Sequence, residues 1–145
     1  MKTVREIAVP VENAPGTLSA ISELLGANGI PILAVTLRAE RNSGSVHVVV
    51  PEPDRVANIL EGAGYAPSVQ EIIAAEIPLH PGGLNALLKS LRLAGVNIEY
   101  LYSFIGGNAA GDSSILLLGV NDLAEAVNAL SEEWIQLHGE ELFMF

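Results

Sequence analysis

The fold is indicated most clearly by Glu12-Asn13-Ala14-Pro15-Gly16-Thr17-Leu18, a loop that returns later in the chain as Leu79-His80-Pro81-Gly82-Gly83-Leu84. When the two Pro-Gly pairs are superposed, the apolar residues that follow coincide at helical spacing. Leu18, Ile21, Leu25 and Gly29 then match Leu84, Leu87, Leu91 and Gly95. Chance rarely preserves both a turn and a helical period, so the sequence predicts an internal duplication.

Around the first loop, hydrophobic periodicity predicts the order strand, helix, strand, strand, helix, strand. Residues 41–44 form a hairpin turn, Pro53 opens the second helix, and glycines at 26–29 and 62–64 end the helices. The expected strands are 7–11, 32–37, 45–50 and 67–70, and the expected helices begin near residues 18 and 53.

The second half repeats this order. Its expected strands are 72–77, 98–105, 114–118 and 134–137, and its helices lie near 84–91 and 121–130. Asn121 is the expected cap of the last helix, and the glycine-rich residues 106–112 are the expected hairpin turn. No flexible linker separates the halves, so we expect domains at 1–70 and 71–145, packed together.

Helices on one side of an antiparallel sheet cover only that face. The fold class is therefore α+β, with two antiparallel sheets that each carry helices on one face. Both faces of the strand at residues 32–35 are apolar. The helices cover one face of the sheet, so Leu33, Val35 and Val49 on the opposite face need another covering surface. Either the two halves cover each other or a second chain does, and this pattern favours a homodimer.

Composition excludes several classes of function. Among 145 residues there is no cysteine, which excludes disulfides, thiolate metal sites and a cysteine nucleophile. A net charge of −10 with scattered basic residues argues against nucleic acid. The charged N-terminal residues do not suit a signal peptide, and no apolar stretch reaches the roughly 20 residues that span a bilayer. We therefore expect a cytoplasmic protein without membrane association.

The two Pro-Gly loops are the best candidate sites. A helix N-terminus presents unpaired backbone N–H groups and a partial positive charge, and glycine lets a ligand approach the backbone. A small carboxylate or similar anion suits such a loop. The alternative interpretation is a plain capped turn.

Other chemistry lacks support in the sequence. His47, His80 and His138 have no metal-ligand spacing and are expected at the surface or at strand edges. Residues 106–112 lack the Lys-Ser/Thr of a phosphate loop. No nucleophile is accompanied by a base. Tyr100 and Tyr102 share one strand face, where packing is favoured over a pocket wall.

Residues 6–18 with Gly29-Ile30, and residues 75–84 with 94–100, resemble the opening of an ACT domain. The two matches together cover essentially the whole chain. The chain as a whole resembles stand-alone tandem ACT proteins, which consist of two such domains. It implies two ferredoxin-like βαββαβ domains and a small ligand, most often an amino acid, bound at the seam between domains. It further implies regulation without catalysis or a cofactor, exerted through a partner enzyme or regulator.

The resemblance to the regulatory domain of phosphoglycerate dehydrogenase assigns ligand contacts to the loop before Pro-Gly and to an asparagine of the partner domain. The loop position holds Asn13 in the first half and Leu79 in the second, and the strand position holds Pro31 and Asn97. A seam that collects Asn13 and Asn97 can hydrogen-bond an amino acid, whereas the opposite seam loses both groups. Capping by Asn13 and a turn at Asn97 are the alternative roles.

The sequence thus predicts an amino-acid-binding regulatory protein, with a pure assembly module as the alternative. The predicted ligand-binding residues are Asn13, Ala14, Pro15, Gly16, Thr17, Leu18, Pro31, Leu79, His80, Pro81, Gly82, Gly83, Leu84, Asn97 and Tyr100.

Overall fold

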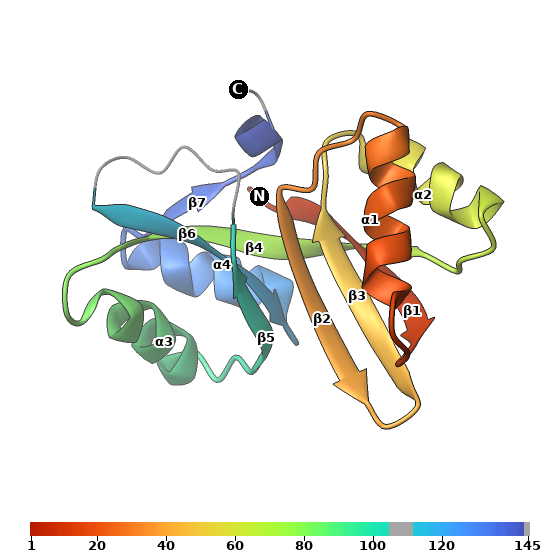
Figure 1. Ribbon diagram of the computed structural model, residues 1–145. Helices are drawn as coiled ribbons and strands as arrows, with labels where there is room; N and C mark the ends of the chain where they lie inside the picture. Colours follow the sequence, from red (N-terminus) through yellow and green to blue (C-terminus); the bar gives the residue numbers. More distant parts are fainter. Residues whose placement is uncertain (105–111, 144–145) are drawn as a thin grey trace. The chain divides into compact units, whose positions relative to one another are not determined.

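A computed structural model of the chain describes residues 1–104 and 112–143 (Figure 1). The chain divides into two compact units, one formed by Arg5–Gln70 and the other by Met1–Val4 together with Glu71–Phe145. We call them the first and the second unit. The predicted turn at 106–112 lies almost entirely outside the described residues. No helix in the described ranges is both long and apolar enough to cross a membrane.

The first unit is an antiparallel sheet with two helices. Strand β3 lies between β1 and β2 and pairs with both. The elements, in chain order, are β1 (Val4–Glu12), α1 (Thr17–Ala27), β2 (Ala34–Glu40), β3 (Ser43–Val49) and α2 (Pro53–Gly62). Pro53 occupies the first turn of α2, where its missing N–H costs nothing, as the sequence predicts.

The second unit repeats the arrangement. Strand β4 pairs with β6 and β7, and β5 pairs with β6, all antiparallel. The elements are β4 (Ser68–Pro78), α3 (Gly83–Leu93), β5 (Ile98–Ser103), β6 (Ser113–Val120), α4 (Leu123–Glu132), β7 (Gln136–His138) and a 3-10 turn (Glu140–Phe143).

Each unit has its own core between its helices and one face of its sheet. In the first unit Ile21 and Leu25 of α1 meet Val46 and Val48 of β3. In the second unit the α3 and α4 leucines pack in the same way on β4 and β6. Alternation along the strands and helical spacing of the leucines place these side chains on the buried faces. The α+β class and the ferredoxin-like organisation are confirmed.

Several local predictions are wrong. The strands expected at 67–70 and 72–77 form one uninterrupted strand, β4, because no turn-forming residue separates them. Strand β2 begins at Ala34 instead of residue 32. Val35 pairs with Val48 and packs on the helix-covered core, so it does not belong to the opposite face.

The boundaries of α4 also differ from the prediction. Asp122 caps this helix, and its carboxylate Oδ1 accepts a hydrogen bond of 3.1 Å from the Glu125 backbone N–H. The expected cap, Asn121, lies outside the helix. Trp134 precedes the last strand, which covers Gln136–His138 only.

Candidate functional site

The loop between β1 and α1 is held against the β2–β3 turn by Asn13. Its side-chain Nδ2 donates to the carbonyl of Arg41 at 2.8 Å, and its backbone N–H donates to the carbonyl of Asn42 at 3.2 Å. Gly16 is the N-cap of α1 with φ 83°, and no side chain caps this helix. The alternative role of Asn13 as the helix cap is therefore excluded.

A hollow of about 220 Å³ opens beside this loop. Its walls are the loop, the start of α1, the second half of β2 and the start of β3. The lining residues are Val11, Glu12, Asn13, Ala14, Gly16, Thr17, Leu18, Ser19, Leu37, Ala39 and Gly44. The structure thus brings together five predicted residues of the first loop, and Pro15 is exposed next to them.

The start of α1 is the part of this hollow that suits an anion, whereas the Glu12 carboxylate on its lining carries negative charge. The first N–H groups of a helix have no intrahelical acceptor and carry a partial positive charge. No acidic side chain lies in the first turn of α1, so that charge is not neutralised within the helix. The Thr17 hydroxyl donates to the carbonyl of Ala14 at 3.0 Å and keeps the loop curled toward the helix.

The second Pro-Gly loop has the same backbone course, and its closing hydrogen bond matches the one from the Thr17 N–H to the carbonyl of Ala14, at 3.4 Å, in the first loop. Gly82 is the N-cap of α3 with φ 90°, and the Gly83 N–H donates to the carbonyl of His80 at 3.1 Å. A Cβ atom on Gly83 would overlap the carbonyl of Pro78, so only glycine fits there. Leu79 is 62% exposed, and Leu84 is exposed as well.

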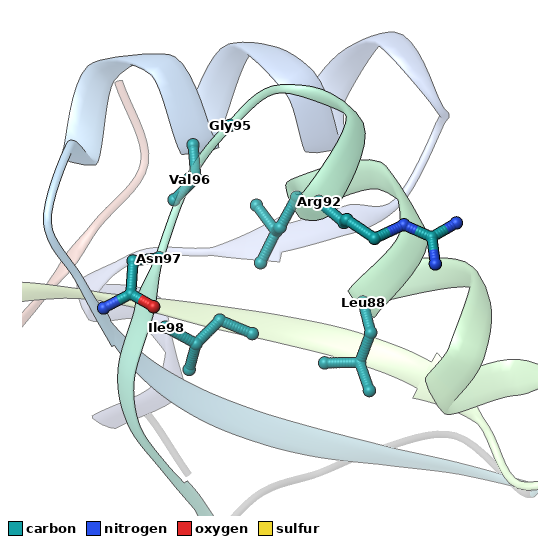
Figure 2. A pocket seen from close by; sticks show the side chains of 7 residues that line it. Leu88, Arg92, Gly95, Val96, Asn97 and Ile98 are labelled. Atoms are coloured by element: carbon teal, nitrogen blue, oxygen red, sulfur yellow. The ribbon is translucent and has the colours of Figure 1, made fainter.

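Asn97 lies on a second hollow, of about 480 Å³, between the end of α3 and the start of β5 (Figure 2). Its backbone is fixed by Asn121: the Asn97 N–H donates to Asn121 Oδ1 at 2.8 Å, and the Asn121 N–H donates to the Asn97 carbonyl at 3.2 Å. In the described part of the chain the Asn97 side-chain amide makes no hydrogen bond. The other lining residues are Leu88, Leu91, Arg92, Gly95, Val96 and Ile98.

The remaining predicted residues are placed as follows. Pro31 is exposed at the corresponding position of the first unit. Tyr100 is half-buried, and its ring lies directly over Gly119 of the neighbouring strand and stacks on Tyr102 with centroids 6.3 Å apart. Asn13 belongs to the first unit and Asn97 to the second. Their meeting at one ligand stays a prediction.

A family comparison identifies the duplicated architecture. The family described as "ACT domain pair" matches residues 2–141. This chain belongs to that family.

Known structures agree with the ACT domain pair in fold. Protein BT0572 from Bacteroides thetaiotaomicron superposes with a TM-score of 0.87 at 23% identity, over 99% of this chain and 97% of that one. The regulatory subunit of aspartate kinase from Thermus thermophilus, in its ligand-free form, gives 0.64 at 12% identity over 91% and 93%. Its counterpart from Thermus flavus gives 0.63 at 14% over 92% and 94%. No curated protein matches by sequence.

One polar cluster of this ACT domain pair was missed by the sequence analysis. Glu6 is fully buried and His47 is 6% exposed. His47 Nδ1 lies 2.8 Å from Glu6 Oε1, which also accepts from Gln70 Nε2 at 2.7 Å. The prediction of a surface or edge histidine is therefore wrong for His47. No short motif signals a contact between residues this far apart in the chain.

The same cluster continues to Ser45, whose Oγ lies 3.0 Å from His47 Nε2. Serine, histidine and carboxylate in this order resemble an acyl-transfer triad. An oxyanion hole, however, needs N–H donors that are free for the substrate. Ser45 lies inside β3, whose backbone is paired on both sides, with Pro10 and with Arg38. The cluster is therefore a buried hydrogen-bond network.

A second carboxylate cluster lies in the second unit. Glu76 accepts from the Ser113 hydroxyl at 2.9 Å, and its other oxygen lies 2.9 Å from His138 Nε2. The Ser113 hydrogen bond, followed by that of His138, lowers the pKa of Glu76 below its ordinary 4.5, against a smaller opposing effect of burial. Among residues 1–104 and 112–143, no group of histidines and carboxylates is arranged to hold a metal ion.

Proposed function

We propose that this ACT domain pair is a regulatory protein that binds a small metabolite of the amino-acid class. The observation that carries the proposal is the hollow of about 220 Å³ at the start of α1, a helix without a side-chain cap, where the lining includes the first helical residues and several apolar side chains. Membership of the ACT domain pair family supports the proposal. So does the occurrence of two Pro-Gly loops in one chain whose described part contains no catalytic constellation.

The chemistry of the hollow selects the ligand class. The carboxylate of an amino acid would lie at the N-terminus of α1, where the helix dipole contributes roughly 0.3–1 kcal/mol. Val11, Leu18 and Leu37 offer an apolar surface to a side chain. Pockets for drug-sized ligands and cofactors measure about 300–1,000 Å³, and this hollow of about 220 Å³ is smaller, which favours a small metabolite.

The Asn97 hollow, in the second unit, is a second candidate site. Its free side-chain amide offers both a donor and an acceptor, which suits the carboxylate and ammonium groups of an amino acid. The Asn121 contacts hold the backbone in place, so little ordering is needed when a ligand binds.

The regulated protein would be a separate partner. Two of the structures with this fold are regulatory subunits of aspartate kinase. We propose by analogy that this chain is a cytoplasmic homodimer that transmits ligand binding to a partner enzyme or regulator. A coupling of about 1–3 kcal/mol between the two binding events would suffice.

A thermal-shift screen of the twenty amino acids tests the proposal. A ligand at one hundred times its Kd adds about 2.7 kcal/mol to the free energy of unfolding, so the melting temperature should rise for one amino acid or a few related ones. No rise with any amino acid would contradict it, and a shift with a partner protein alone would favour the assembly module.

A pocket-filling variant makes the screen specific. Ala39→Leu adds volume inside the first hollow, from strand β2. The matched control is Ala20→Leu, the same substitution on an exposed position of α1 that does not line this hollow. Ala39→Leu should abolish the shift and Ala20→Leu should preserve it. Equal shifts in both variants would place the ligand elsewhere.

A further inference from the structure

The end of α4 differs from the ends of the other three helices in the described chain. After the C-cap of α1, α2 and α3 comes a glycine with positive φ: Gly29 at 72°, Gly64 at 96° and Gly95 at 73°. After the C-cap of α4 the corresponding residue is Trp134, with φ 60°.

The hydrogen bonds show that the four positions are equivalent. At each helix end the backbone N–H of the residue after the C-cap donates to the carbonyl three positions earlier. The N–H of the following residue donates to the carbonyl five positions earlier. In α4 these bonds are Trp134 N–H to Ser131 O and Ile135 N–H to Leu130 O, both 3.1 Å. This is the Schellman arrangement, whose left-handed residue is normally glycine. A bulky side chain there is an outlier.

Packing does not compensate for this strain. The Trp134 side chain is 95% exposed, and it is the only tryptophan of the chain. Glu132 and Glu133 precede it at the C-terminal end of α4, where the last turn contains no basic residue, as in α1 and α2. The preference for glycine in a left-handed conformation is thus violated at an exposed position. Such violations occur at functional sites.

A hollow of about 440 Å³ adjoins the tryptophan. Its lining is mainly apolar, and the one basic residue in it, Lys2, lies 3.6 Å from the carboxylate of Glu141. The lining residues are Met1, Lys2, Val127, Ser131, Trp134, Ile135 and Leu137. Glu132 and Glu133, which precede Trp134 in the chain, do not line this hollow and lie on a neighbouring one with residues of α3 and α4. We call the tryptophan hollow and these two glutamates together the α4-end surface.

We infer that the α4-end surface docks a basic, partly apolar segment of a partner protein. A lysine or arginine would lie over the Trp134 ring, beside the two carboxylates and the negative pole of α4, and an aliphatic side chain would enter the hollow. Cations bind tryptophan faces better than other aromatic faces. A second copy of this chain is disfavoured, because a symmetric contact would bring the same carboxylates together.

Anisotropy of a fluorescein-labelled hexapeptide that alternates lysine, leucine and arginine tests this inference on the full chain. We expect saturable binding that weakens with salt and is at least ten-fold weaker in Trp134→Ala and in Trp134→Gly. The double variant Glu132→Gln/Glu133→Gln should bind several-fold more weakly. Glu23→Gln/Glu61→Gln, with the same change of net charge on exposed positions elsewhere, should bind as the wild type does.

Three results would overturn the inference. The first is unchanged peptide affinity in Trp134→Ala, which would mean that only the overall negative charge attracts the peptide. The second is equal binding of a peptide with glutamate in place of each basic residue. The third is a change of oligomeric state in Trp134→Ala by sedimentation, which would make the surface a contact between copies. Because Trp134→Gly relieves backbone strain, loss of fold does not explain loss of binding.

Discussion

At the scale of single residues, Trp134 allows backbone strain and side-chain contacts to be separated. A left-handed conformation costs an L-residue roughly 1–2 kcal/mol, and glycine returns part of this through its flexible unfolded state. We expect Trp134→Gly to raise the free energy of unfolding by about 1 kcal/mol. Trp134→Ala keeps the strain and should change stability little, since the side chain is almost fully exposed.

Urea unfolding of the wild type, Trp134→Gly and Trp134→Ala measures these differences in the free energy of unfolding, provided that the three m-values are equal. A Trp134→Gly variant less stable than the wild type would show that the indole makes stabilising contacts in solution. In that case the strained position would no longer indicate an interaction surface.

Glu76 gives the chain a pH-dependent increment of stability. Its pKa is lowered in the folded protein, first by the Ser113 hydroxyl and then by His138. Its contribution is therefore present above the unfolded pKa and is lost as the pH falls below about 4.5. Ser113→Ala removes the larger cause, so the pKa of Glu76 should rise toward its ordinary value.

The variant should consequently lose more stability at pH 7 than at a pH below the measured wild-type pKa of Glu76, where the carboxyl group is protonated in both proteins. Carbon-detected NMR titration of the Glu76 carboxyl group gives the pKa, and urea unfolding at the two pH values gives the stability. Equal losses at both pH values would show that Ser113 acts through packing and not through the charge of Glu76.

At the scale of elements, the two residues before α4 have separate roles. Asp122 caps the helix, so Asp122→Ala should cost about 1 kcal/mol of unfolding free energy. Asn121→Ala leaves the cap in place but frees the Asn97 backbone. We expect faster amide hydrogen exchange at Asn97 in this variant only. Unchanged or slower exchange at Asn97 in Asn121→Ala would contradict the role of Asn121. An Asp122→Ala variant as stable as the wild type would contradict the role of Asp122 as the cap.

Periodicity predicted the type and order of these elements because each half repeats the same amphipathic pattern, but it divided the continuous strand β4 into two. Their ends were less predictable. Asn121 and Asp122 are both good caps, and only the backbone course of the chain selects Asp122. Trp134 favours a strand by propensity, but the helix end that precedes it imposes a left-handed conformation.

The candidate site shows the same limit. The first loop could be found from Pro15-Gly16 alone, since local sequence sets both the turn and the helix start. The tie from Asn13 to Arg41 and the buried pair of Glu6 and His47 join residues distant in sequence. No local pattern encodes such contacts, so they follow only from strand register.

At the scale of the whole molecule, charge imbalance outweighs individual ion pairs. The chain has 17 acidic and 7 basic side chains. Exposed pairs such as Arg5 with Asp54, at 3.1 Å, contribute roughly 0–1 kcal/mol each and weaken with salt. Even complete pairing would leave unpaired carboxylates that repel one another in the compact state.

We therefore expect sodium chloride to stabilise the free chain between about 0.01 and 0.15 M, as the Debye length falls from about 30 to 8 Å. The melting temperature should rise with salt, and it should rise less in Glu23→Gln/Glu61→Gln, which carries two fewer negative charges. A fall with salt would mean that the ion pairs dominate. The same increase in salt should weaken binding of the basic peptide to the α4-end surface, because salt screens the attraction between opposite charges there. Opposite signs of these two effects in one buffer series would distinguish global repulsion from a local contact.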